Sequence, residues 1–347
     1  MQIIRSRAFY LLVFSILFIF SSTTFANAAN LPNGKCPTLG KTATIKSVKY
    51  ICAKSGKNLI WIKAAVLSAE DAKLESLYNE VKLKMDKSDP KFDISINIDP
   101  QLSKSSWSKD SVASIGSATK LLQAIGVKTS TPMKIYISWG MEYLDKYLPD
   151  YCKFSAGGGS CGQTGIIFAD LKWFATSWGY GGIEKPYKSE MDKFTISANL
   201  PHEMGHFGHS EVAMSTGNFD YWKYIPPWLR EGGAEYFKLL SSAYDRRVTY
   251  KSLHDLYLKN GGSRCSNISL AQMTEQDSKT DGCEYGKGLF AAEYLVLKTG
   301  RADAPFLMNQ KAGTDTASIF MSAYGFTLAD FNKEADAYYL KLLASNK

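Results

Sequence analysis

Three features of the 347-residue sequence predict an α+β fold with a small mixed sheet and a helical C-terminal subdomain. Residues 133–139 and 165–169 form short segments rich in β-branched and aromatic residues, and we expect a further strand near Phe194. After these segments we expect a helix that carries His202 and His206, helical periodicity at 227–237, and a final helix at 329–343. The composition, 45% hydrophobic and 21% charged, is that of a globular chain with a sizeable core.

Residues 1–28 have the pattern of a signal peptide. Arg5 and Arg7 precede the apolar run 8–20, which is short for a bilayer span, and Ala26-Asn27-Ala28 fits the small-residue rule for signal peptidase. We expect cleavage after Ala28, with an uncleaved membrane anchor as the alternative. No later apolar segment is long enough to span a bilayer. The mature chain is therefore expected to be secreted, outside the cell or in the cell envelope, with no stable membrane span.

The six cysteines are even in number, as expected for a chain in an oxidising compartment. No two of them have CxxC spacing, so a thiolate zinc site is not expected. The count permits many pairings, but the clustering along the chain suggests three local bridges, Cys36–Cys52, Cys152–Cys161 and Cys265–Cys283.

Residues 29–66 are expected to form a small β-hairpin clamped by a disulfide. Two β-prone runs, 42–52 and 58–63, flank the turn-like Lys54-Ser55-Gly56-Lys57. An inhibitory prosegment, a spacer and an attachment module for the cell envelope all remain open as roles for this segment.

A helical and strand region at 67–130 should precede a domain at 131–347. The spacing of apolar residues predicts helices at 69–87 and 109–125, and strict alternation predicts a half-buried strand at 92–98. Between the later strands, Gly157-Gly158-Gly159 predicts a flexible loop. A phosphate cradle is excluded there because no Lys-Ser/Thr pair follows the glycines.

The charge distribution argues against nucleic acid as a partner. The formal net charge is +8, and loss of Arg5 and Arg7 with the signal peptide leaves a mildly basic chain. Most lysines are dispersed among acidic and hydroxyl residues, which is typical of a solvated surface, and no arginine-rich stripe is present.

The motif with the clearest chemistry is His202-Glu203-Met204-Gly205-His206. On a helix, residues four apart lie on one face, so both imidazoles can reach one ion. Glu203 follows the first imidazole, where a carboxylate can take a proton from a metal-bound water. Zinc suits this set because it accepts nitrogen and oxygen ligands tetrahedrally and leaves one position for water. Chance pairing of two histidines on a helix is the alternative.

A third protein ligand is expected from a second helix. Residues 227–237, Pro-Trp-Leu-Arg-Glu-Gly-Gly-Ala-Glu-Tyr-Phe, follow a Pro-Pro break and have helical periodicity. Glu231 lies near the start of this helix, and antiparallel packing on the first helix would bring its carboxylate to the metal. Asp220 is the alternative third ligand. Glu235 and Asp245 are candidates to accept a hydrogen bond from the ligating imidazoles.

HExxH followed by W-L-x-E-G-x-A-E-Y-F resembles the gluzincin zinc metallopeptidases, which include the M1 aminopeptidases and the bacterial collagenases. The resemblance covers roughly residues 130–347 and implies a zincin-like catalytic domain that binds Zn²⁺ through His202, His206 and Glu231. Tyr285-Gly286-Lys287-Gly288 resembles the Y-x-K-G segment of M1 enzymes, which implies that Tyr285 steadies the oxyanion of the tetrahedral intermediate. An ordinary loop tyrosine is the alternative.

Residues 181–185, Gly-Gly-Ile-Glu-Lys, resemble the G-x-M-E-N exopeptidase motif, which implies that Glu184 binds the free amine of a substrate. Lys185 replaces the asparagine, and the gap to His202 is shorter than in that family, so a solvated glutamate in a glycine-rich turn is an equal alternative. The spacing from His206 to Glu231 is also longer than in M1 enzymes and is nearer to collagenase-type proteins.

Other zinc-peptidase classes fit less well. The metzincin pattern requires glycine and histidine where this chain has His209 and Val212. His209 is expected to face away from the metal, on the surface or bonded to a loop, and His254 has no expected role on a polar helix.

The motifs together predict a secreted zinc peptidase that acts on peptides or proteins, as an endopeptidase or an aminopeptidase. Glu203 would act as base and then acid, and the metal and Tyr285 would polarise the carbonyl. Two alternatives remain open: a non-catalytic zinc-containing module at the cell surface, and hydrolysis of a different bond at the same metal.

Overall fold

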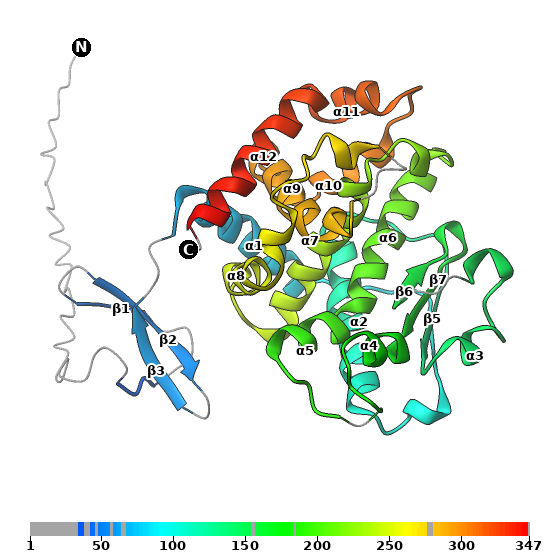
Figure 1. The fold of residues 1–347 in the computed structure, drawn as a ribbon, viewed down its shortest axis with the longest axis horizontal. Helices are drawn as coiled ribbons and strands as arrows, with labels where there is room; N and C mark the ends of the chain where they lie inside the picture. Colours follow the sequence, from blue (N-terminus) through cyan, green and yellow to red (C-terminus); the bar gives the residue numbers. More distant parts are fainter. Residues whose placement is uncertain are drawn as a thin grey trace, which may run out of the picture. The chain divides into compact units, whose positions relative to one another are not determined.

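The computed structural model describes residues 34–37, 42–45, 48–55, 58–63, 67–153, 157–183, 185–275 and 280–345. The predicted signal peptide lies outside this part of the chain. The chain divides into two compact units, Met1–Leu67 and Ser68–Lys347. Figure 1 shows the elements of both units in chain order.

The first unit contains a three-stranded antiparallel sheet rather than the two-stranded hairpin that we expected. Its strands are β1 (Thr42–Ile45), β2 (Val48–Ser55) and β3 (Asn58–Lys63), in the order β1-β2-β3. The predicted run at 42–52 divides into β1 and part of β2, a break that β-propensity along one segment does not reveal. The predicted Cys36–Cys52 disulfide is present, with a Cα–Cα distance of 5.7 Å.

The second unit contains a four-stranded mixed sheet in the order β4-β5-β7-β6. β4 (Ile94–Ile98), β5 (Met133–Ser138) and β7 (Ile166–Asp170) are parallel, and β6 (Gly158–Ser160) pairs antiparallel with β7 at the edge. The prediction of an α+β fold with a small mixed sheet is therefore confirmed. The prediction of a flexible loop at Gly157–Gly159 is wrong for Gly158 and Gly159, whose backbones pair with β7 in the ladder.

Helices make up most of the second unit and lie mainly after the sheet strands in the sequence, as Figure 1 shows. The α-helices are α1 (Ala69–Lys87), α2 (Ser106–Ala124), α3 (Met141–Leu144), α4 (Leu171–Ser177), α5 (Glu190–Ser197), α6 (Asn199–Met214), α7 (Pro227–Arg246), α8 (Tyr250–Gly261), α9 (Cys283–Thr299), α10 (Ala304–Leu307), α11 (Thr316–Tyr324) and α12 (Leu328–Ser345). Short 3₁₀ turns connect several of them, including η6 (Gly262–Cys265) and η8 (Met308–Gln310).

The strand that we expected near Phe194 is wrong, because this segment is helix α5. Ser189 caps the helix by accepting a hydrogen bond from the Asp192 N–H at 3.0 Å, which satisfies one of the free amides of the first turn. Phe194 is buried in the main core. In so short a segment, the alternation of Phe194 and Ile196 does not distinguish a strand from a helix that is buried on one side.

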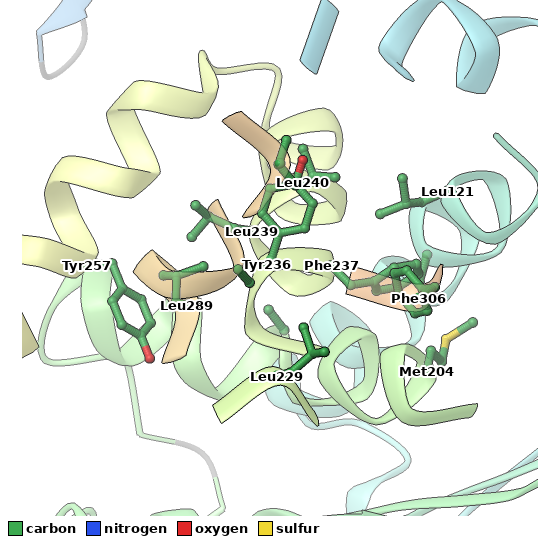
Figure 2. Packing of buried hydrophobic residues seen from close by; sticks show 14 of the residues in the cluster. Leu121, Met204, Leu229, Tyr236, Phe237, Leu239, Leu240, Tyr257, Leu289 and Phe306 are labelled. Atoms are coloured by element: carbon green, nitrogen blue, oxygen red, sulfur yellow. The ribbon is translucent and has the colours of Figure 1, made fainter. Parts of the chain in front are cut away.

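Helix α7 is at the centre of the core and supplies much of its apolar surface. Figure 2 shows its side chains Leu229, Tyr236, Phe237, Leu239 and Leu240 packed among side chains from other elements. The neighbouring side chains in this view are Leu121 of α2, Met204 of α6, Tyr257 of α8, Leu289 of α9 and Phe306 of α10. Burial of apolar side chains such as these supplies the main favourable free energy of folding.

Glycines allow α7 to approach two helices closely. A Cβ on Gly205 of α6 would lie 2.9 Å from the Cα of Ala234 on α7. A Cβ on Gly232 of α7 would lie 2.1 Å from the carbonyl carbon of Gly288 on α9. Gly232 and Ala234 belong to one run of small residues that directly follows Glu231. This run allows α7 to lie close to both α9 and α6.

We expect Gly232→Ala to lower the free energy of unfolding by about 3 kcal/mol, because the added methyl overlaps backbone atoms that cannot rotate away. Gly116→Ala is the matched control. Gly116 is also inside a helix, α2, where an added Cβ meets no atom within 4 Å, so we expect a gain of about 0.5–1 kcal/mol. Urea unfolding of both variants measures the difference. Equal stabilities would contradict the close packing of α7 on α9.

The other two predicted disulfides are also present. The Cα–Cα distances are 5.7 Å for Cys152–Cys161 and 5.6 Å for Cys265–Cys283. Three disulfides are consistent with an extracellular chain. Among the described helices, none combines the length and the apolar character that a bilayer crossing requires.

Candidate metal centre

Helix α6 presents both histidines of the HExxH motif on one face. His202 and His206 are one helical turn apart, and their Nε2 atoms lie 3.1 Å from each other. Both imidazoles are buried, as is Glu203 between them in the sequence. Ligand atoms of these three residues lie within 4.8 Å of one another, close enough to share one ion.

Helix α7 brings the Glu231 carboxylate to the two imidazoles. Glu231 Oε2 lies 3.1 Å from His206 Nε2 and 3.5 Å from His202 Nε2. Pro226 and Pro227 define the start of α7, and Glu231 lies in its second turn. The structure therefore brings together the three residues that the sequence suggested as ligands, although two of them are separated by more than twenty residues.

The spacing of these three atoms fits a tetrahedral zinc site. Ligands at 2.0–2.1 Å from a tetrahedral ion are about 3.3–3.4 Å from one another. The three atoms are 3.1, 3.1 and 3.5 Å apart. Two imidazole nitrogens and one carboxylate oxygen are also the donor set of catalytic zinc sites with an open fourth position. The residues present therefore fit the metal.

Neighbouring charged residues orient two of the three candidate metal ligands, Glu231 and His202. Arg230 Nε donates to the other Glu231 oxygen, Oε1, at 3.0 Å, which leaves Oε2 directed at the imidazoles. Glu235 Oε1 lies 2.9 Å from His202 Nδ1, so the carboxylate favours a proton on that nitrogen and leaves Nε2 as the donor. Lys238 Nζ in turn donates to both Glu235 oxygens, at 3.1 and 3.3 Å. Of the two residues suggested for this role, Glu235 therefore contacts one of the two imidazoles, that of His202.

The two central carboxylates have opposite electrostatic environments. Burial acts to raise the pKa of Glu231, but the imidazoles of His206 and His202 outweigh it and hold the pKa well below its usual value. Burial raises the pKa of Glu203, and the imidazoles only partly oppose that effect. Glu231 therefore favours its charged form, while Glu203 holds a proton more readily.

The glycine-rich edge strand passes directly over Glu203. A Cβ on Gly158 would lie 2.9 Å from Glu203 Oε1 and 2.3 Å from Asn199 Oδ1, so only glycine fits there. Asn199 precedes Glu203 by one helical turn and donates from Nδ2 to the Gly157 carbonyl at 3.4 Å. Sequence reasoning missed both the edge strand and Asn199, since neither a three-glycine run nor a lone asparagine indicates a contact with a distant helix.

Tyr285 lies at the start of α9, on the same side of the site as His202. Its ring is stacked on the His202 imidazole, with centroids 5.6 Å apart and planes at 28°. Although the residue is 41% exposed, desolvation of the hydroxyl and the charges of Glu231 and Glu203 raise its pKa. The hydroxyl therefore stays protonated at neutral pH and is able to donate a hydrogen bond.

The side chains of the candidate metal centre line one cavity of about 940 Å³. The residues from α6, α7 and α9 that line it include His202, Glu203, His206, Glu231 and Tyr285. The edge strand and the aromatic side chains of α4 form a second part of the lining. A space of this size takes several residues of a peptide or another ligand of similar size.

Glu184, the candidate amine-binding residue, lies outside the described residues. Its described neighbours contact helix α2: the Ile183 carbonyl accepts from Ser105 Oγ at 3.4 Å, and the Lys185 carbonyl accepts from Trp107 Nε1 at 3.1 Å. Neither neighbour is part of the cavity lining. The role of Glu184 stays a prediction.

The two other acidic candidates have different partners. Asp220 is ion-paired with Lys223 at 3.0 Å, and its side chain is 70% exposed, as expected of a surface residue rather than a buried ligand. Asp245 is influenced mainly by its own desolvation, which raises its pKa, and then by Arg246, Asp110 and Lys193. Glu231 is thus the carboxylate that the fold places on the imidazole pair.

The remaining histidines, His209 and His254, are buried and do not line the cavity. His209 Nδ1 lies 3.0 Å from Asn309 Oδ1 in turn η8, and burial lowers the pKa of this imidazole to about 3, so it is neutral. Of the two environments that we expected for His209, surface or loop-bonded, the structure shows the second. His254 is buried against Glu293, with His254 Nε2 at 3.4 Å from the carboxylate, although its helix segment had suggested a polar surface.

Comparison with known proteins adds no assignment. No protein-family model matches the chain, and neither a curated protein nor a solved structure matches it.

Proposed function

We propose that this chain is a secreted zinc metallopeptidase of the gluzincin type, which hydrolyses peptide bonds. The observation that carries the proposal is the convergence of His202 Nε2, His206 Nε2 and Glu231 Oε2 at 3.1–3.5 Å, with Glu203 beside them in an open cavity. The resemblance of the HExxH and W-L-x-E-G segments to gluzincins supports the same reaction class. An intact Glu203 argues against a non-catalytic zinc module, which has no need of a base.

In this mechanism His202, His206 and Glu231 hold the ion, while Arg230 and Glu235 fix two of these ligands. When bound, zinc supplies Lewis-acid polarisation of the scissile carbonyl and makes water a nucleophile at neutral pH. Glu203 takes the proton from the attacking water and delivers it to the leaving amine. The protonated Tyr285 hydroxyl donates a hydrogen bond to the oxyanion as it develops. Glu203 lies below the edge strand, which leaves little of its side chain exposed.

The proposal is tested by metal content and hydrolysis measured on the same preparation. We expect about one zinc per chain by mass spectrometry, and cleavage of internally quenched peptides that stops on addition of 1,10-phenanthroline and returns with added zinc. Peptides with blocked and free N-termini are assayed together, because cleavage of the blocked set identifies an endopeptidase. A metal-free preparation with full activity would overturn the proposal, and so would a zinc-loaded chain that cleaves no peptide of a diverse library.

A further inference from the structure

One part of the cavity lining is basic and contains no carboxylate. Lys259 and Asn260, from the end of α8, and Arg264, from turn η6, all line the cavity that contains the metal-site residues. We call these three residues the basic wall. Within the described part of the chain, neither Lys259 nor Arg264 makes an ion pair with a carboxylate.

Two of the three acidic groups of the lining already contact imidazoles or cations. The cavity is lined by three carboxylates, Glu203, Glu231 and Glu235. Glu231 contacts the imidazoles and Arg230, and Glu235 contacts His202 and Lys238. Lys238, the third cation of the lining, is therefore matched by Glu235. Because the lining has three carboxylates and three cations, a divalent ion at the metal centre makes the cavity positive in total.

The side chains of the basic wall are exposed, and two contacts restrain Arg264. Arg264 Nη2 donates to the Asp281 carbonyl at 3.1 Å, which restrains one side of the guanidinium. The next residue, Cys265, is bonded to Cys283 at the start of α9, the helix that carries Tyr285. The disulfide therefore restrains the backbone at Arg264 relative to the start of α9, where Tyr285 lies. A guanidinium presents several N–H donors in a planar fork that matches the two oxygens of a carboxylate.

From this arrangement we infer that the basic wall is a subsite for a carboxylate of the peptide substrate, with Arg264 as the principal specificity-determining residue and Lys259 adding charge. The inference rests on the proposed function and adds a substrate class to it: peptides with an acidic side chain, or a free C-terminus, within reach of the scissile bond. Because Arg264 and Lys259 are exposed, we expect their ion pair with a carboxylate to favour it over the matching amide by about 5-fold.

The test measures binding without turnover. Zinc-loaded Glu203→Gln protein is titrated with fluorescent heptapeptides of alanine with a central phenylalanine, in which Glu or Gln is moved through the flanking positions and the C-terminus is free or amidated. We expect peptides with the carboxylate at one position to bind about 5-fold more tightly than their amide counterparts, with the difference shrinking as salt is added. Preference for a Glu position identifies a side-chain subsite, and preference for the free C-terminus identifies a terminal one.

Substitutions in the same background locate the effect. We expect Arg264→Gln to remove most of the preference, with the melting temperature showing that the protein is folded. Lys333→Gln is the control, because Lys333 is an exposed lysine of α12 outside the cavity lining, and we expect it to keep the preference. Equal binding of acidic and amide peptides, or a preference that survives Arg264→Gln, overturns the inference. If the preference is present while unsubstituted protein cleaves nothing, the subsite stands and the peptidase proposal fails.

Discussion

Replacement of Glu203 by glutamine is expected to lower kcat/KM for peptide cleavage by roughly 10²–10⁴-fold while zinc remains bound. The amide is similar in size to the carboxyl group but cannot accept the proton of the attacking water, so the rate falls even though the cavity keeps its shape. Glu203 is adjacent to the metal ligands but is not needed to complete the set of three donors at His202, His206 and Glu231. The measurement is steady-state kinetics with zinc content determined on the same sample.

Glu211→Gln is the matched control on the same helix. Glu211 is also a buried glutamate of α6, but its Oε2 accepts a hydrogen bond from the Ser130 N–H at 2.6 Å, and it does not line the cavity. An amide oxygen can still accept that hydrogen bond, so we expect Glu211→Gln to retain the activity of the unsubstituted protein. If both variants lose activity to the same extent, the effect of Glu203→Gln reports on helix α6 as a whole and not on proton transfer.

The second large effect is expected for Glu231→Ala, which removes one of three donors from the ion. We expect zinc affinity to fall by more than the roughly 10–100-fold that loss of an outer hydrogen-bond partner causes, and activity to fall with it. Competition with a chromogenic zinc chelator measures the affinity directly. The two remaining imidazoles are expected to bind zinc more weakly, because the variant lacks the charged carboxylate oxygen of Glu231.

Asp220→Ala separates the two possible third ligands. Asp220 is exposed and paired with Lys223, so we expect its loss to leave zinc affinity unchanged. A normal affinity in Glu231→Ala together with a reduced one in Asp220→Ala would reverse the ligand assignment. The two variants therefore decide between the carboxylates without any assumption about the substrate.

Local sequence patterns predicted most helices and strands correctly. The i, i+4 spacing of His202 and His206 indicates a shared helix face because helical geometry depends only on neighbouring residues. The helix 69–87 and the strand around Ile96 followed from periodicity for the same reason. The predicted disulfides joined cysteines that are near in sequence, where the chain between them limits how far apart they can be. Phe194 was assigned wrongly because a short apolar alternation fits either element.

These local patterns could not predict contacts between segments that are far apart in the sequence. The edge strand at Gly158, the hydrogen bond of Asn199 to Gly157 and the place of Arg264 in the cavity lining each join residues far apart in the chain. Their partners depend on how helices and strands pack, and packing depends on the shapes of whole surfaces. The position of a glycine in the sequence does not identify the segment whose backbone packs against it.

The amino-acid sequence by itself determined the chemical types of the candidate ligands, imidazole and carboxylate, and the one-turn spacing of His202 and His206. Both follow from local properties, side-chain chemistry and helix pitch. Only the tertiary structure decided that Glu231, and not Asp220, meets the imidazoles. The physical reason is the close approach of α6 and α7 at Gly205 and Ala234, where the lack of a side chain on the glycine lets the two helices, and with them the three donors, come within reach of one ion.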